Sequence, residues 1–509
     1  MKIIFRRWFD KFKRRITKRL DKSHDTITFR PEFAASNIDY EVSDRVGAIS
    51  CGGIGAIHMM AKRYGLIETI DQRLHLLKFH RLYQESDHVL NIAYNALCNG
   101  TCLQDIEVRR NDLSFLNALG ATRIPDPTTS GDFCRRFTAA ANYTLIDIFN
   151  ETRLKVWAKQ PHRFFDRATI DMDGTKAVTT GECKRGMDIS YDGLWCYHPG
   201  VLTLAETGEV LSIVNRSGNR PSHEGIAQEV DRALLICVKA GFRQIVLRGD
   251  TDFSQTERLD GWNYNPKIRF YFGYDAKPNL EEIADKLPES AWRRLQRPVR
   301  HTVKTEPRRR PANVKEQVVK ARQFENQRLV SEDVAEFDYR PTACRTTYRM
   351  VVVRKNISVE KGEQVLFPND RYFFYITNDR EHSAADVVFE ANGRCNQENL
   401  IAQLKSGVHA LRAPVDNLLS NWAYMLMTAL AWNLKAWFAL TLPEKPGRWQ
   451  QRHHDEKQLV LRLEFKTFLN AFMLLPCQII KKSRKIVYRL LGWNPHLSIF
   501  FRLLGALRQ

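Results

Sequence analysis

Carboxylates occur in three settings along this chain, and together they suit divalent-metal chemistry. Asp171 and Asp173 belong to one strand-like segment, Asp250 ends a second, and Glu398 lies in a segment with helical spacing. Mg²⁺ is usually held by a few carboxylates with several waters. Two such ions roughly 4 Å apart can activate a nucleophile and stabilise the leaving oxygen of a phosphodiester. We therefore treat these carboxylates as one candidate site.

The first segment, Ala168 to Thr175, has the alternation of a strand. Side chains alternate with period two, so Ile170 and Met172 point to one face while Asp171 and Asp173 point to the other. The alternation alone allows either aspartate to face a metal ion.

The second segment contains the apolar run Ile245-Val246-Leu247, which is typical of a strand buried on both faces. It stops at Gly249-Asp250, and open α/β sheets bind ligands outside the carboxyl ends of their strands. Asp250 is therefore predicted to be a strand-end carboxylate. Asp252, which lies beyond the strand end, is the alternative.

The third segment places Arg394, Glu398 and Lys405 four and seven residues apart, which puts them on one stripe of a helix. Glu398 could instead be an ordinary surface carboxylate that pairs with Arg394 one turn earlier. The apolar positions of this helix are Leu400, Ile401, Leu404, Val408 and Leu411.

These motifs resemble the signature of bacterial insertion-sequence transposases with a DDE catalytic triad. The resemblance is closest to the insertion-sequence 1380 family, within the insertion-sequence-4 superfamily, and it covers nearly the whole chain. The matching residues are Asp173-Gly174-Thr175, Arg248-Gly249-Asp250-Thr251-Asp252-Phe253, and Arg394 with Glu398 and Lys405. Further similar stretches are Gly100 to Glu107, Pro127 to Ser130, Tyr197 to Gly200 and Thr207 to Val210.

The resemblance implies an α/β fold with an RNase H-like catalytic core and a mainly β insertion. It also implies that Asp173, Asp250 and Glu398 hold two Mg²⁺ ions, for which Mn²⁺ can substitute. Asp173 is preferred over Asp171 because the family's aspartate precedes x-Thr. The implied reaction is cut-and-paste transposition, in which water cuts the element's ends and the freed 3′ hydroxyl attacks target DNA.

One position departs from the superfamily pattern. The helix motif usually has a tyrosine three residues before the arginine, where this chain has Ala391. This departure puts one active-site contact in doubt while all three acidic positions remain filled. Two alternatives therefore stay open: a metal-dependent nuclease that does not join strands, and an inactive DNA-binding repressor.

The charge balance favours a polyanionic partner. The 509 residues include 78 Lys and Arg against 58 Asp and Glu, a formal charge of +20. We expect double-stranded DNA, comprising the element's terminal inverted repeats and the target, bound by a homodimer. The basic clusters are Arg6-Arg7, Lys11 to Lys22, Arg308 to Arg310 and Lys481-Lys482-Ser483-Arg484-Lys485.

Individual basic residues are candidates for contacts to the DNA. The resemblance suggests that Arg394 and Lys405 contact phosphates near the cut site, and Arg248 belongs to the second motif. Arg216 and Arg220 lie in the segment Asn215 to Arg220, which is either a DNA-contacting loop or a solvated turn.

The ten cysteines show no CxxC pair or zinc-ligand spacing, which favours reduced thiols in a cytoplasmic protein. We expect a bacterial, nucleoid-associated location. The stretch from Leu418 to Leu440 is interrupted by Asn421, Asn433 and Lys435, so it is predicted to be a buried helix and not a membrane span.

The chain divides into four expected regions. Residues 1–150 form a helical region for DNA-end binding and dimerisation, and residues 165–275 with 385–440 form the catalytic core. Residues 276–384 form the insertion, because the segment between Asp250 and Glu398 is too long for a plain loop. Residues 441–509 form a basic C-terminal region that is expected to be helical, including Ile486 to Leu504.

Overall fold

The structure is a computed structural model of the whole chain. It describes residues 14, 35, 38–40, 46–78, 82–181, 183–297, 317–318, 321–322, 325–361, 364–483 and 485–508. The chain divides into two compact units, Met1–Val46 and Gly47–Gln509. The basic clusters at Arg6-Arg7 and Lys11 to Lys22, apart from Arg14, and at Arg308 to Arg310 lie outside the described residues. The fold below is that of the second unit.

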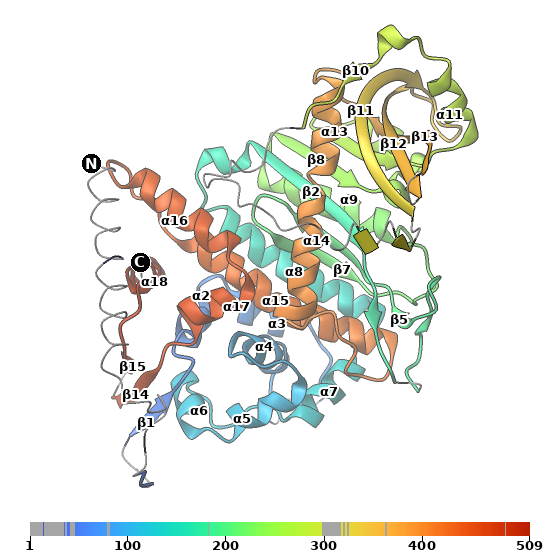
Figure 1. Cartoon of the computed structure of the whole chain (residues 1–509). Coiled ribbons are helices and arrows are strands. Elements are labelled where there is room, and N and C mark those ends of the chain that lie inside the picture. The colour runs from blue at the N-terminus through green and yellow to red at the C-terminus, as the bar shows by residue number, and fades with distance from the viewer. Residues whose placement is uncertain are drawn as a thin grey trace, which may run out of the picture. The chain divides into compact units, whose positions relative to one another are not determined.

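A mixed sheet of nine strands runs through this unit, in the order β10-β11-β12-β13-β9-β8-β2-β6-β7 (Figure 1). Strand β2 pairs in parallel with β8 and antiparallel with β6, β6 pairs antiparallel with β7, and β8 pairs in parallel with β9. The bounds are β2 Arg167–Gly174, β6 Gly200–Leu204, β7 Glu209–Val214, β8 Gln244–Gly249 and β9 Ile268–Tyr274.

The strand predicted before Asp250 is confirmed as β8, and a hairpin of β6 and β7 and then a helix precede it in the chain. Helix α9 (Ile226–Ala240) connects β7 to β8 and ends at Gly241, which adopts a left-handed conformation with φ of 94°. Glycine adopts this conformation without the steric cost that a Cβ imposes, so the helix stops there. The apolar stripe of α9 packs on β6 and β7.

The segment between β9 and the later helices extends the same sheet. Strand β13 (Gln364–Thr377) pairs antiparallel with β9, and β12 (Tyr348–Lys361), β11 (Glu325–Tyr339) and β10 (Arg293–Arg294) follow in turn. The expected mainly β character of this segment is therefore confirmed for its described residues. Helices α10 (Thr256–Asn263) and α11 (Pro278–Asp285) lie before these strands in the chain.

Helix α15 (Leu418–Thr441) occupies the centre of the helical part (Figure 1). It is buried continuously from Ser420 to Leu440 and packs against α4, α8, α16 and β7, as its sequence predicted. The polar Asn433 is satisfied there, because its amide bonds the backbone N–H and C=O of Val210 in β7. No helix among the described residues has the length and apolar character to cross a membrane.

Helices from the first third of the chain pack on α15 or on one another. They are α2 (Ile54–Arg63), α3 (Leu66–Arg73), α4 (Glu85–Leu97), α5 (Ile106–Arg110), α6 (Leu113–Leu119), α7 (Pro127–Arg135) and α8 (Ala139–Trp157). The helices that follow α15 are α16 (Gln450–Arg462), α17 (Phe465–Phe468) and α18 (Leu497–Arg508).

The C-terminal region is not entirely helical, which corrects the prediction for Ile486 to Leu504. Strands β14 (Cys477–Lys482) and β15 (Lys485–Leu490) form a hairpin, and of the predicted segment only the part from Leu497 onward is helical, in α18. Strand β14 also pairs with β1 (Gly47–Ile49). This pairing with a strand more than 400 residues away supplies backbone partners that the local sequence pattern cannot reveal.

A small three-stranded sheet follows β2 in the chain. It contains β3 (Ala177–Val178), β5 (Trp195–Tyr197) and β4 (Asp188–Ile189) in that order. Strand β3 begins only a few residues after Asp173, so this sheet lies next to the end of β2 in the sequence.

Candidate active site

The parallel pairing of β2 and β8 brings two of the predicted carboxylates to one edge of the large sheet. Its register aligns Asp171 with Arg248, and Asp173 and Asp250 each lie two residues further along. Both carboxylates therefore arrive at the carboxyl ends of neighbouring parallel strands. This is the place where open α/β sheets bind their ligands.

The third predicted carboxylate lies on α14 (Cys395–Ala402). A break at Gly393 and Arg394 separates α14 from α13 (Ala384–Asn392). At this corner the Arg394 guanidinium donates to Asp173, with 3.1 Å between Nη1 and Oδ2. Its Nη2 lies 4.0 Å from Oδ2 of Asp250. One cation thus joins the two strand-end carboxylates to the helix that carries Glu398.

The electrostatics link Asp173 to the other two carboxylates. Burial raises the pKa of Asp173 to about 6, Arg394 opposes this rise, and Asp250 and Glu398 add to it. Burial also raises the pKa of Asp250, again opposed by Arg394. The charges of Asp250 and Glu398 therefore both act on Asp173.

Lys405 also lies within electrostatic reach of Asp173. It lies in the π-helical turn Gln403–Gly407 that continues α14, and such turns are frequent at functional sites. Burial lowers the pKa of Lys405, and the nearby charge of Asp173 opposes that effect. The predicted helical stripe therefore brings Arg394, Glu398 and Lys405 together near Asp173, although its last part is a π turn.

Gln397 is a site residue that the sequence interpretation missed. It is buried, and its Nε2 donates to the backbone carbonyls of Asp171 and Val201, at 3.0 Å each. These bonds fix α14 against β2 and β6. A signal was present, because Gln397 precedes Ile401 by four residues and so occupies the apolar stripe of the helix.

Asp171 and Arg248 form a buried ion pair beneath the site. Arg248 Nε lies 2.6 Å from Asp171 Oδ1, and its Nη2 lies 2.8 Å from Oδ2. The same guanidinium reaches Glu390 of α13 at 3.1 Å. Both oxygens of Asp171 are thus engaged, and of the two alternatives only Asp173 lies beside Asp250. The prediction that Arg248 contacts DNA is corrected, because its side chain is directed into the protein.

Arg216 requires the same correction. Its side chain is buried and donates to the backbone carbonyls of His198, Pro221 and Glu224, at 2.9, 3.1 and 3.0 Å respectively. It therefore holds the loop together from inside. Arg220 has an exposed side chain 3.7 Å from Glu224, so a DNA contact by Arg220 stays a prediction.

The position that departs from the superfamily pattern lies on α13. Ala391 is buried and packs in an apolar cluster that includes Val246, Tyr271, Val387 and Val388. Its side chain therefore helps to seat α13 on the sheet just before the corner at Arg394.

The donors are of the kind that magnesium prefers, because Asp173 and Asp250 lie at neighbouring strand ends and the charge of Glu398 acts on Asp173. Within the described ranges, no three His, Cys, Asp or Glu side chains are grouped as closely as a metal site requires. The positive charge between Asp173 and Asp250 comes from Arg394 instead. A cation bound beside Asp173 would oppose the effect of burial, which raises the pKa of Asp173 to about 6, and would favour its ionised form.

Comparison with known families agrees with this geometry. Residues 43–509 match the family described as Transposase DDE domain group 1. The chain belongs to this family of DDE transposases. A search of curated proteins finds no match.

Among solved structures, the chain is similar to a piggyBac transposase in a cryo-EM synaptic complex with hairpin DNA. The identity is 9%, the TM-score is 0.37, and the match covers 84% of this chain and 83% of the other. The family assignment therefore depends on the match over residues 43–509.

Proposed function

We propose that this DDE transposase moves its insertion sequence by cut-and-paste transposition, through metal-dependent cleavage of the element's ends followed by strand transfer. The observation that carries the proposal is that Arg394, at the start of the helix that bears Glu398, pairs with Asp173 and lies 4.0 Å from Asp250 at the ends of two neighbouring parallel strands. We further propose that the chain belongs to the insertion-sequence 1380 family, on the motifs that contain these residues.

The strand order supports an RNase H-like core. Strands β7, β6 and β2 form an antiparallel meander, and β8 and β9 follow in parallel with β2. In the proposed core, β2 and β8 each deliver one aspartate and α14 delivers the glutamate. Strands β10 to β13 would then be an insertion that extends the sheet beyond β9.

The roles of the acidic residues follow from their positions. Asp173, Asp250 and Glu398 would hold two Mg²⁺ ions, with Mn²⁺ as a substitute. When bound, the ions would activate the nucleophile and stabilise the leaving 3′ oxygen. Asp173 contributes a negative charge only when ionised, so its pKa of about 6 predicts that its contribution falls below that pH.

The basic residues would orient the DNA strand. Arg394 can make charge-assisted hydrogen bonds to a carboxylate and to a phosphate oxygen, because its guanidinium has several donors in a fixed plane. Lys405 would supply a second positive charge on the same helical stripe. The ion pair between Asp171 and Arg248 would position both strand ends without touching the substrate.

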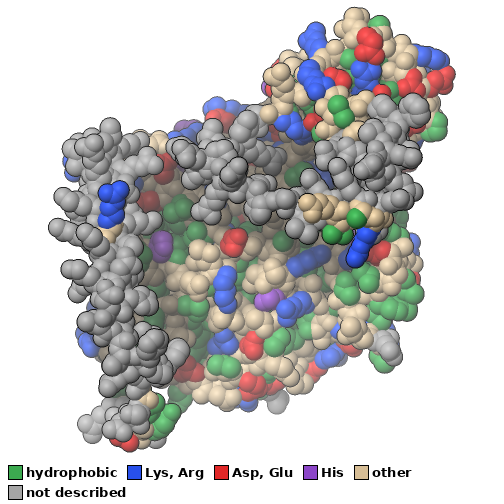
Figure 2. Space-filling view, viewed as in Figure 1, with side chains coloured by type: hydrophobic (Ala, Val, Ile, Leu, Met, Phe, Trp, Pro, Cys, Tyr) green, Lys and Arg blue, Asp and Glu red, His purple; other side chains and the backbone are tan. Residues whose placement is uncertain are grey.

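The proposed partners are the element's terminal inverted repeats and a target duplex, bound by two copies of the chain in the bacterial cytoplasm. The formal charge of +20 supports an interaction with DNA phosphates. On the face in Figure 2, basic side chains of described residues are interspersed with acidic ones and are not gathered in one block. Local basic elements are therefore better candidates for contacts than the whole face.

The test is Mg²⁺-dependent cleavage and joining of DNA that carries the element's ends. The variants are Asp173→Asn, Asp250→Asn and Glu398→Gln, with Asp252→Asn as a matched control. We expect the three variants to bind DNA without cutting or joining it, while the control keeps both activities. Activity in any of the three would remove that residue from the triad.

Pre-cut ends separate the remaining alternatives. A transposase joins them to target DNA, whereas a nuclease without joining activity leaves them unchanged. A wild-type protein that binds the ends but neither cuts nor joins them would favour the repressor.

A further inference from the structure

The β14–β15 hairpin carries the basic cluster that the sequence places near the C-terminus. Strand β14 pairs with β1 only over Cys477 to Ile479, so the hairpin beyond Ile479 is a two-stranded ribbon. Lys482 and Lys485 form the last cross-strand pair, and Lys481 pairs with Ile486. The free end of the ribbon is thus basic.

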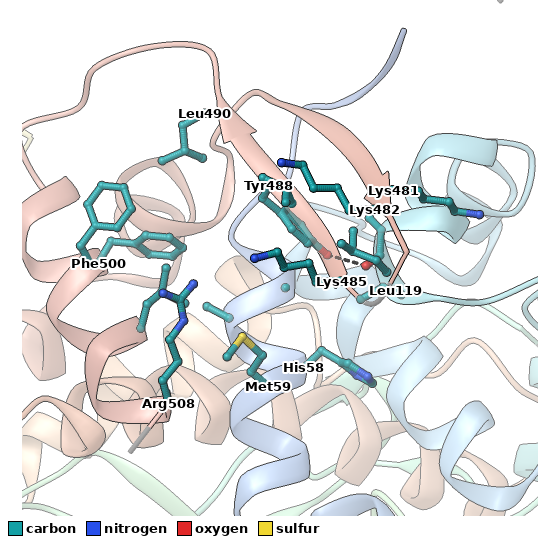
Figure 3. A pocket seen from close by; sticks show the side chains of 18 residues that line it. His58, Met59, Leu119, Lys481, Lys482, Lys485, Tyr488, Leu490, Phe500 and Arg508 are labelled. Atoms are coloured by element: carbon teal, nitrogen blue, oxygen red, sulfur yellow. Dashed lines mark hydrogen bonds between the residues drawn. The ribbon is translucent and has the colours of Figure 1, made fainter. Parts of the chain in front are cut away.

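The base of this ribbon is anchored firmly. Tyr488 donates its hydroxyl hydrogen to the carbonyl of Ala118 at 2.7 Å (Figure 3). Its ring lies so close to α2 that a Cβ at Gly55 would come within 2.6 Å of it. Only glycine allows this approach, so the sequence of α2 accommodates the ribbon. The lysines therefore extend from a fixed support.

The lysines at the ribbon end are available to a partner. Lys481, Lys482 and Lys485 are exposed, and none forms an ion pair with any other described residue. Lys481, Lys482 and Lys485 line a cavity of about 960 Å³ between the ribbon, α2 and α18, which Figure 3 shows from close by. Arg508 of α18 lines the same cavity and is also exposed. Among the described residues that line this cavity there are cations and no carboxylates.

We propose that the β14–β15 ribbon is a second DNA-contacting element, separate from the carboxylate site, whose lysines neutralise backbone phosphates. A two-stranded ribbon has dimensions that the major groove of B-DNA admits. Lysine ammonium groups bind phosphates as point charges, independently of sequence. The inference rests on the proposed function, because it takes DNA as the polyanion.

The experiment measures the salt dependence of binding by the full-length protein to a fluorescent duplex of arbitrary sequence, in EDTA. Each phosphate contact contributes about −0.9 to the slope of log K against log salt. For the variant Lys481→Ala/Lys482→Ala/Lys485→Ala, we expect the slope to become shallower by about 2 to 3. The corresponding triple Arg variant keeps the charges and should keep the wild-type slope.

A control variant, Lys239→Ala/Lys267→Ala/Lys286→Ala, removes three exposed lysines from other elements and should change the slope much less. Thermal unfolding checks that each variant is folded. An unchanged slope in the ribbon variant would overturn the inference, as would an equal loss in the control. Binding of an acidic peptide at the ribbon with an unchanged DNA slope would assign it to a protein partner instead.

Failure of the inference and failure of the proposed function give different results. If the wild type shows no salt-dependent binding to DNA, the proposed function itself fails. If the wild type binds and the triad variants lose cleavage while the ribbon variant keeps the full slope, only the ribbon proposal fails.

Discussion

Replacing Asp173 by Asn should stabilise the folded protein at neutral pH. The Asp173 side chain is only 16% exposed, and its pKa is raised from 3.8 to about 6. That rise corresponds to about 3 kcal/mol of unfavourable free energy for the ionised carboxylate in the folded state. Asparagine has nearly the same shape and no charge, so Asp173→Asn should gain up to about this amount.

The sign of the pH dependence follows from proton binding. Between pH 3.8 and about 6 the folded protein holds the Asp173 proton more tightly than the unfolded chain does. Stability of the wild type therefore falls as pH rises through this window, and the loss is complete above it. The advantage of the Asn variant should be about 1.6 kcal/mol at pH 5 and about 3 kcal/mol at pH 8.

Urea unfolding of wild type and Asp173→Asn at pH 5, 6, 7 and 8 measures this difference. The variant Glu257→Gln, at an exposed position outside the site, is the matched control and should show a gap that stays near zero. A constant gap across pH, or an Asn variant less stable than wild type at pH 8, would refute the reasoning. A constant gap would mean that the pKa of Asp173 is the same in the folded and unfolded states, and a less stable Asn variant would mean that Arg394 stabilises the carboxylate more than burial destabilises it.

Two further substitutions test the framework around the site. Glu209→Gln removes the charge that faces Arg153 in a fully buried pair with 3.0 Å between the paired atoms, and should lower the unfolding free energy by about 3–5 kcal/mol. Urea unfolding measures this decrease in the unfolding free energy. A decrease of less than about 1 kcal/mol would contradict the argument that removing one partner leaves an uncompensated buried charge. Gly393→Ala places a Cβ 2.3 Å from Arg248 Nη1, so it should destabilise by about 1–3 kcal/mol and reduce DNA cleavage. Gly261→Ala, where no atom lies within 4 Å of the new Cβ, should not destabilise; equal effects at both glycines would contradict the prediction.

The sequence indicated the secondary structure around the candidate site because those signals are local. The apolar run before Gly249 predicted a buried strand that ends at Asp250, and β8 ends there. The apolar stripe through Ile401 and Leu404 predicted the inward face of a helix, and both residues are buried. The spacing of apolar residues along a strand or helix involves only neighbouring residues, so it can be recognised in the sequence without knowing the fold.

Tertiary structure decided whether the arginine side chains are buried or exposed. Arg248 lies within β8, one residue before its end at Gly249, and the sequence suggested a DNA contact. Its partner is Asp171, which lies 77 residues earlier and meets it only because β2 and β8 pair in parallel. A charged side chain can be buried only where a partner compensates its loss of hydration. The residues next to it in the sequence do not show whether a distant partner is present.

In the C-terminal hairpin, too, the sequence determined some features and the tertiary structure decided others. The sequence by itself determined the composition of the segment 481–485, with its cluster of positive charge, and therefore the kind of partner to expect. Only the tertiary structure decided that Ile486 to Leu490 is a strand, because β14 finds its other partner at Gly47 to Ile49. Strand pairing satisfies backbone hydrogen bonds between segments far apart in the chain, whereas helical bonds close within four residues.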